Sequence, residues 1–137
     1  MMKFNTLFAI NVFIMTSQQT HLKASFEKVD LKPPLDWTAG ESLFPFKVIA
    51  GYNANLSEYD HQTWADYVLG ECKKYDSCTS CISNQATNSG STGGRFWFGY
   101  SFSGGATSPA DYKRNPDVTD SIAYTISGEN SQVVEEI

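Results

Sequence analysis

The chain has 137 residues and a formal charge of −5 at pH 7, and 41% of its residues are hydrophobic. This length suits one domain with a single core rather than two domains. The acidic balance repels phosphate backbones and anionic bilayers, and the basic pairs Lys73-Lys74 and Lys113-Arg114 are too small to reverse it. We therefore expect neither nucleic acid nor a membrane surface as a partner.

Residues 1–24 have the pattern of a secretory signal peptide. Lys3 precedes the apolar run from Leu7 to Met15, which is too short to span a bilayer and matches a signal-peptide core of about 7–15 residues. Ser17 and Ala24 offer cleavage points, and a buried N-terminal helix or strand is the alternative. We expect export to the extracellular space. The mature chain then has a formal charge of −7, because the removed segment holds two lysines and no acid.

The next stretch leads into the expected domain. Residues 25–43 are mixed polar, contain Pro33-Pro34, and predict an extended lead-in, with the domain and its core beginning at residue 44. Residues 44–52 are β-prone, and Pro45 places them at a strand start or a sheet edge. Asn55 is followed by Leu-Ser and is an N-glycosylation acceptor in a secreted chain, so we expect it on an exposed loop.

From Ser57 the period of the sequence becomes helical. Ser57 is the expected N-cap, and Trp64, Val68 and Cys72 recur at positions i, i+4 and i+8. This spacing puts the three side chains on one face and predicts a single amphipathic helix that ends near Lys73.

Three cysteines, Cys72, Cys78 and Cys81, lie within ten residues. In an oxidising compartment we expect one disulfide and one residual thiol, and the spacing leaves the pairing open. A structural zinc site needs four ligands, and the mature chain adds only the distant His61. A redox Cys-x-x-Cys needs an electropositive setting, whereas this one follows Asp76. We expect neither a metal nor a cofactor.

Residues 83–94 are rich in Asn, Ser, Thr and Gly and predict a surface loop. A strand follows, in which four aromatic residues share one face by period-2 alternation: Phe96, Phe98, Tyr100 and Phe102. We expect this face to be core against the helix, and a ligand platform is the alternative. Trp97 then lies on the opposite face beside Gly99 and is the better binding candidate.

The remaining chain contains a connector and one more strand. Residues 106–116 predict the connector, and Ile122, Tyr124 and Ile126 alternate as a final strand. Residues 128–137 form an acidic tail.

These segments together resemble the PAN/apple-like domains of small secreted fungal proteins over roughly residues 44–127. The resemblance rests on the helix ending in Cys72, the turn at Cys78, and residues 96–105, 107–112 and 117–124. It implies a helix on an antiparallel sheet, disulfides between the two, and binding of proteins or carbohydrates without catalysis. The family usually has a cysteine on the central strand, where this chain has aromatics, so the helix-to-sheet disulfide is not expected here. Trp97 and Tyr112 are the candidate binding residues.

No residue pattern indicates catalysis. His61 is the only histidine after residue 24, and no spacing selects two carboxylates from the many available. The sequence therefore predicts a secreted α+β protein, with one helix packed on a small antiparallel β-sheet. We expect it to bind an extracellular protein or polysaccharide, including as a host-directed effector. The alternative is a small secreted enzyme of secondary metabolism or carbohydrate processing that uses carboxylates in a cleft.

Overall fold

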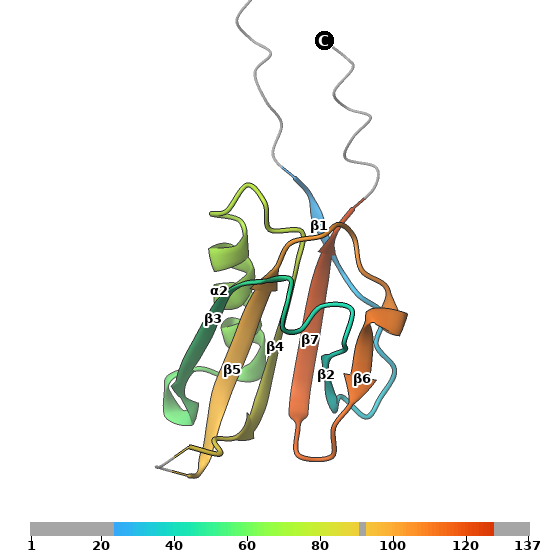
Figure 1. Cartoon of the computed structure of the whole chain (residues 1–137). Coiled ribbons are helices and arrows are strands. Elements are labelled where there is room, and N and C mark those ends of the chain that lie inside the picture. The colour runs from blue at the N-terminus through green and yellow to red at the C-terminus, as the bar shows by residue number, and fades with distance from the viewer. Residues whose placement is uncertain (1–23, 91–92, 128–137) are drawn as a thin grey trace, which may run out of the picture. The chain divides into compact units, whose positions relative to one another are not determined.

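The computed structural model describes residues 24–90 and 93–127 (Figure 1). The expected signal peptide, apart from Ala24, and the acidic tail lie outside these residues. The described part contains the helix α2 (His61–Cys72) and the 3-10 turns η3 (Leu56–Glu58) and η4 (Pro109–Asp111). Its strands are β1 (Phe26–Lys28), β2 (Trp37–Ala39), β3 (Val48–Asn55), β4 (Ser80–Thr87), β5 (Arg95–Phe102), β6 (Tyr112–Arg114) and β7 (Thr119–Ile126). The predicted α+β class, with one helix and an antiparallel sheet, is confirmed for these residues.

Five of the strands form one antiparallel sheet in the order β1-β7-β4-β5-β3. Helix α2 packs on one face of this sheet, over β4 and β5. The other two strands, β2 and β6, pair as a ribbon that covers β4 and β7 on the opposite face (Figure 1). At the β1 edge the backbone N–H of Ser127 donates to the carbonyl oxygen of Ser25 at 2.8 Å, which extends the pairing of β1 with β7.

Two clusters of buried side chains lie on the two faces of the sheet. The helix-side cluster is Trp64, Val68, Cys72, Cys78, Cys81 and Trp97. The ribbon-side cluster is Val29, Ala39, Leu43, Ile82, Phe102, Tyr112 and Ala123. Because alternate residues of a strand point to opposite faces, β4 and β5 contribute side chains to both clusters. These two strands are therefore covered on both sides.

The core begins earlier in the chain than residue 44, so that prediction is wrong. Val29, Ala39 and Leu43 are 6%, 7% and 4% exposed, and the expected lead-in contains β1 and β2. Both strands are three residues long and pair with the distant strands β7 and β6. Local composition carries little signal for such long-range pairs. The predicted sheet edge is confirmed, because β3 is an edge strand that begins just after Pro45.

The predicted loop over residues 83–94 is wrong for its first part, because β4 runs to Thr87 in the middle of the sheet. Ser83 and Asn84 are only 2% and 7% exposed. The Ser83 hydroxyl donates to the carbonyl oxygen of Ile122 at 3.4 Å, and the Asn84 amide donates to that of Trp37 at 3.3 Å. Ser83 and Asn84 are tolerated in this strand because their hydrogen bonds are made inside the fold.

Helix α2 begins three residues later than predicted, and its cap is Asp60 rather than Ser57. The Asp60 carboxylate accepts the backbone N–H of Thr63 at 2.8 Å, and the Thr63 hydroxyl accepts the backbone N–H of Asp60 at 3.0 Å. This reciprocal pair satisfies N–H groups that the first turn leaves without a partner. Ser57 lies in the separate turn η3. Among the described residues, no helix has the length and apolar content that crossing a membrane requires.

Candidate functional site

In the structure, the face of β5 that packs against α2 is the opposite of the one that the sequence predicts. Trp97 is 4% exposed and packs in the helix-side cluster with Trp64. Its indole N–H donates to the carbonyl oxygens of Leu56 and Tyr59, at 3.3 and 3.2 Å. The prediction that Trp97 lies on the face away from the helix is therefore wrong, and its ring is not presented to solvent.

Small residues on the helix side of β5 explain this facing. A Cβ atom added to Gly99 would lie 2.5 Å from Cγ2 of Val68, so α2 sits directly on the glycine. Ser101 is fully buried on the same side, and its hydroxyl is 2.9 Å from that of Tyr52. The helix packs where Gly99 and Ser101 leave room beside the buried Trp97, and the face that carries the four rings of Phe96, Phe98, Tyr100 and Phe102 is turned away from it.

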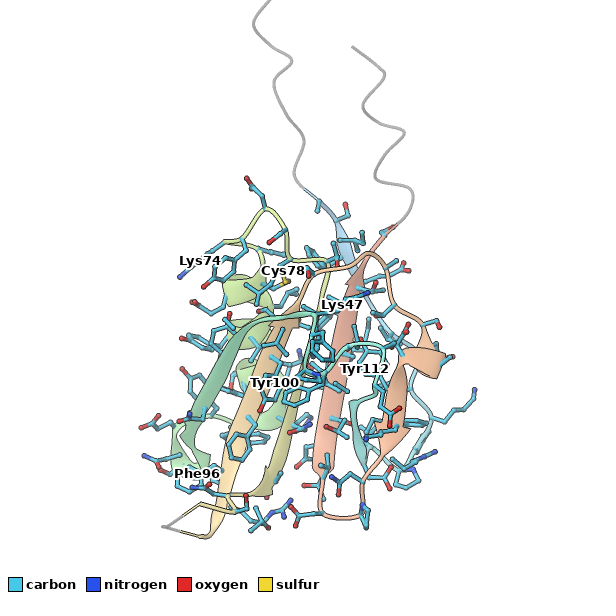
Figure 2. All side chains as sticks on the ribbon, viewed as in Figure 1. Lys47, Lys74, Cys78, Phe96, Tyr100 and Tyr112 are labelled. Atoms are coloured by element: carbon cyan, nitrogen blue, oxygen red, sulfur yellow. A yellow bond between two sulfur atoms is a disulfide. The ribbon has the colours of Figure 1, made fainter. Side chains whose placement is uncertain are left out.

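Tyr112, the second binding candidate, is also a core residue. It is 5% exposed in the β2-β6 ribbon, and its hydroxyl is 2.8 Å from that of Thr107 (labelled in Figure 2). Burial raises the pKa of the Tyr112 hydroxyl to about 12, while the hydrogen bond with Thr107 acts in the opposite direction. Neither residue chosen from the sequence presents its ring at the surface.

One accessible aromatic surface lies on the ribbon side of β5. We call it the aromatic strip, and it consists of Phe44, Phe96, Phe98 and Tyr100. The ring centroids of Phe96 and Phe98 are 6.4 Å apart, and the Phe44 ring meets Tyr100 edge to face at 5.3 Å. The three β5 rings are part-exposed and Phe44 is 44% exposed. Figure 2 shows Phe96 and Tyr100 along β5, in front of the sheet as viewed there.

The strip stays uncovered because its neighbours on the edge strand are short. In the β3–β5 register Tyr100 pairs with Gly51, Phe98 with Asn53 and Phe96 with Asn55. All three partners are exposed, and none has a side chain long enough to close over a ring. On the other side, the β4 residues in register with these rings are Ile82, Asn84 and Ala86. The strip is thus bordered in register by uncharged residues, with amides along the β3 side.

The loop before β3 adds a second exposed ring. Phe46 is 94% exposed, two residues beyond Phe44, and so it contributes little to the packing of the fold. The stem of Lys47 lies over Gly104, where a Cβ atom would be 2.5 Å from Cδ of the lysine (Lys47 is labelled in Figure 2). The loop is therefore fixed at Phe44 and at Lys47, with Phe46 projecting between them.

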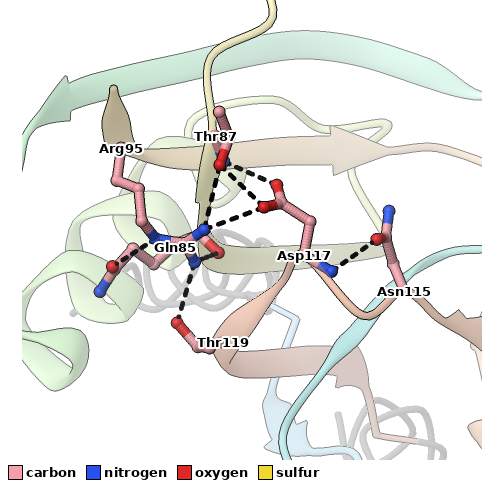
Figure 3. Close-up of polar contacts among 6 residues, drawn as sticks. All are labelled: Gln85, Thr87, Arg95, Asn115, Asp117 and Thr119. Carbon is pink, nitrogen blue, oxygen red and sulfur yellow. Dashed lines mark hydrogen bonds and ion pairs between the residues drawn. The ribbon is translucent and has the colours of Figure 1, made fainter. Parts of the chain in front are cut away.

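A polar network at the other end of β5 has a structural role (Figure 3). The Arg95 guanidinium donates to the Gln85 side-chain and main-chain oxygens, at 2.9 and 3.1 Å. It also donates to Asp117 at 3.1 Å and to the hydroxyls of Thr87 and Thr119, each at 3.2 Å. Hydrogen bonds from the backbone N–H and hydroxyl of Thr87 lower the pKa of the Asp117 carboxyl. With its donors engaged by these neighbours, Arg95 ties β5 to β4 and β7.

The sulfur chemistry agrees with the prediction of one disulfide and one thiol. Cys72, at the end of α2, is bonded to Cys78 in the following loop. Cys81 is a free thiol, 1% exposed, on β4. Burial raises its pKa to about 12, so the reactive thiolate is suppressed at neutral pH.

Of the other residues that the sequence singles out, His61 lies apart from the aromatic strip and Asn55 lies at its end. His61 is the first residue of α2 and is exposed. Asn55 is exposed at the last position of β3, beside Phe96. Within residues 24–90 and 93–127, no three His, Cys, Asp or Glu side chains gather as metal ligands would.

Comparison of the chain with models of protein families, with curated proteins and with solved structures finds no match in any of the three.

Proposed function

We propose that this chain is a secreted binding protein whose aromatic strip contacts an extracellular polysaccharide. The observation that carries the proposal is the row of part-exposed rings at Phe96, Phe98 and Tyr100, extended by Phe44. Exposed apolar patches bordered by polar residues mark interaction sites. Flat aromatic rings pack against the C–H faces of sugar rings, and amide groups exchange hydrogen bonds with sugar hydroxyls.

The polar character of the border favours a neutral ligand. The exposed neighbours Gly51, Asn53 and Asn55 carry no charge, and the chain as a whole is acidic. An acidic polysaccharide would be repelled by the net charge of the protein. A neutral polysaccharide needs no opposite charge and uses the amide border directly. An extracellular protein remains the second class of partner, because aromatic residues are also enriched in protein interfaces.

We also propose that the chain is related to PAN/apple-like domains. This relationship is supported by one helix packed on an antiparallel sheet. The Cys72–Cys78 disulfide joins the helix to its own following loop, which agrees with a divergent member that lacks the helix-to-sheet bond. We further propose that the protein acts outside the cell that exports it, as an effector directed at a host surface.

The enzyme alternative is less well supported. The carboxyl groups of Asp60 and Asp117 have lowered pKa values, because each accepts hydrogen bonds from a threonine, Thr63 and Thr87 respectively. A general acid in a glycoside hydrolase needs a raised pKa instead. These two carboxylates also cap a helix and anchor Arg95, which are sufficient structural roles.

The proposal is tested by sedimentation of the mature chain with insoluble chitin, cellulose and β-1,3-glucan, in parallel with capture from an extracellular protein extract. Phe44→Ser removes a strip ring that is 44% exposed, and Tyr75→Ser removes a ring of nearly equal exposure, 43%, in the loop after α2. We expect retention on one of the polysaccharides, weakened at least about tenfold by Phe44→Ser and unchanged by Tyr75→Ser. Equal binding by both variants, or binding to none of the polysaccharides, would overturn it.

A further inference from the structure

The glycosylation acceptor Asn55 lies next to the aromatic strip. It is in register with Phe96 across the β3–β5 pair, so the two side chains leave the same face of the sheet. Directly opposed residues of antiparallel strands have Cβ atoms about 5 Å apart. Asn55 is exposed and Phe96 is part-exposed. A sugar attached to the Asn55 amide would therefore begin within reach of the Phe96 ring.

The local geometry directs the Asn55 amide and leaves room beside it. Asn55 has extended backbone angles, φ −71° and ψ 145°, at the end of β3, and the chain then enters the turn η3. Its amide nitrogen donates to the Glu58 carboxylate at 3.4 Å, and glycosylation leaves one N–H on that nitrogen. Further along the same face of β3 come Asn53 and Gly51, which are exposed and short. No bulky neighbour on β3 stands in register between the attachment point and the rings.

From this juxtaposition we propose that the first sugars of a glycan on Asn55 pack on Phe96 and cover that end of the aromatic strip. The inference rests on the proposed function, since it assigns the same sugar-stacking chemistry to the same rings. It adds that the glycan attached to Asn55 competes with external polysaccharide for the same rings. The glycan-bearing form binds external polysaccharide less tightly than the form without it, and removing the glycan exposes the full strip.

The contact is measured with material from a eukaryotic secretory host. The glycosylated chain, the same chain trimmed by an endoglycosidase to a single N-acetylglucosamine, and Asn55→Gln are compared with and without Phe96→Ala. We expect the glycosylated and trimmed forms to melt roughly 2–6 °C above Asn55→Gln, the shift of one cross-strand contact in a domain of about 100 residues. In the Phe96→Ala background this difference disappears. The glycan effect is taken as a difference in melting temperature within each background, so the direct effect of Phe96→Ala on stability cancels.

Tyr75→Ala is the matched control, because it removes an exposed ring that follows the last residue of α2, whereas Asn55 precedes the first, and it should leave the glycan effect unchanged. A glycan effect that persists in Phe96→Ala overturns the contact, and so does a mass spectrum with no glycan on Asn55. The proposed function is judged separately, by polysaccharide binding of the Ser57→Ala protein, which loses the glycosylation acceptor sequence and its glycan but keeps the Asn55 amide beside the strip. If that protein binds and glycosylation does not weaken the binding at least about threefold, the competition fails while the proposed function stands.

Discussion

Val68 of α2 lies against Gly99 of β5 so closely that a Cβ atom at Gly99 would be 2.5 Å from Val68 Cγ2. The contact joins the middle of the helix to the middle of the strand. It also determines that Trp97 and Ser101, on the same side of β5, are buried under the helix. The aromatic strip is exposed as a result, because its rings occupy the alternate positions.

Replacing Gly99 with Ala should lower the free energy of unfolding by about 1–3 kcal/mol, the cost of overpacking a core. The matched control is Gly70→Ala, since Gly70 is exposed within α2 and a Cβ atom there meets nothing within 4 Å. That substitution should raise the free energy of unfolding by about 0.5–1 kcal/mol through helix propensity. Urea titrations of both variants measure the two effects. A neutral Gly99→Ala would mean that the helix lies farther from β5.

Truncating Trp97 should be far more damaging than truncating Phe98. Trp97→Ala removes a buried indole with two hydrogen bonds, and we expect a loss of about 3–5 kcal/mol in the free energy of unfolding. Phe98→Ala removes a part-exposed ring and should cost clearly less. Thermal midpoints of the two variants give the order directly. The reverse order would contradict the facing of β5.

Cys81 should resist alkylation in the folded protein. Its thiol is 1% exposed, and burial raises its pKa to about 12, so both access and ionisation are suppressed at pH 8. Iodoacetamide at pH 8 should modify no cysteine of residues 24–127 in the native, non-reduced chain and one after unfolding in urea. Mass spectrometry reads both states. Rapid modification of the native chain would show that the thiol is accessible.

Alkaline pH should destabilise the fold through the same thiol. The Cys81 pKa is 9.0 for an unperturbed thiol and about 12 in the fold, so between these values the unfolded chain releases a proton that the folded chain retains. Stability from this source is complete below pH 9 and is lost as the pH rises toward 12, by at most about 1.4 kcal/mol per pH unit. Denaturant midpoints from pH 8 to 10.5 should fall, and more steeply in the parent than in Cys81→Ala. Parallel slopes would exclude Cys81 as the cause.

Acid should weaken the fold through Asp117. Its pKa is lowered in the folded state, so the stability it contributes is present above its ordinary value of 3.8 and is lost as the pH falls through the folded pKa. Asp117→Asn should make the urea midpoint less dependent on pH between 5 and 2. Asp76→Asn, which removes the same charge from an exposed loop, should keep the parent dependence. Identical profiles for both variants would show that Asp117 is not the group responsible.

The helix, the last strand and the aromatic strand are predictable because their periods are strong. Trp64, Val68 and Cys72 are buried on one helix face as their spacing predicts. The facing of β5 is not predictable in the same way, because period-2 alternation separates two faces without saying which neighbour covers each. The four large rings predict that their face packs against the helix. The decisive signal was the smallness of Gly99, which lets the helix approach.

The rest of the fold depends on long-range pairing. Ser83 and Asn84 read as a loop, yet they are buried because Ile122 and Trp37 supply main-chain acceptors from distant parts of the chain. The exposure of the candidate surface, which the sequence offers only as the alternative ligand platform, depends on long-range structure in the same way. Whether Phe96 and Phe98 are covered depends on how far the ribbon and the loop before β3 extend over the sheet, and no local pattern encodes that.

The hydrogen bond between Ser127 and Ser25 has a practical consequence for engineering. Residues 25 and 127 leave the sheet side by side, at the end where Ser80, Phe102 and Thr125 are in register. Phe96 lies six residues back along β5, roughly 20 Å away by the rise of a strand. The domain can therefore be inserted into a surface loop of a carrier protein, or be circularly permuted with a short linker, without separating the strands of its sheet. Displayed in that way, it would point the Phe96 end of its aromatic strip away from the carrier.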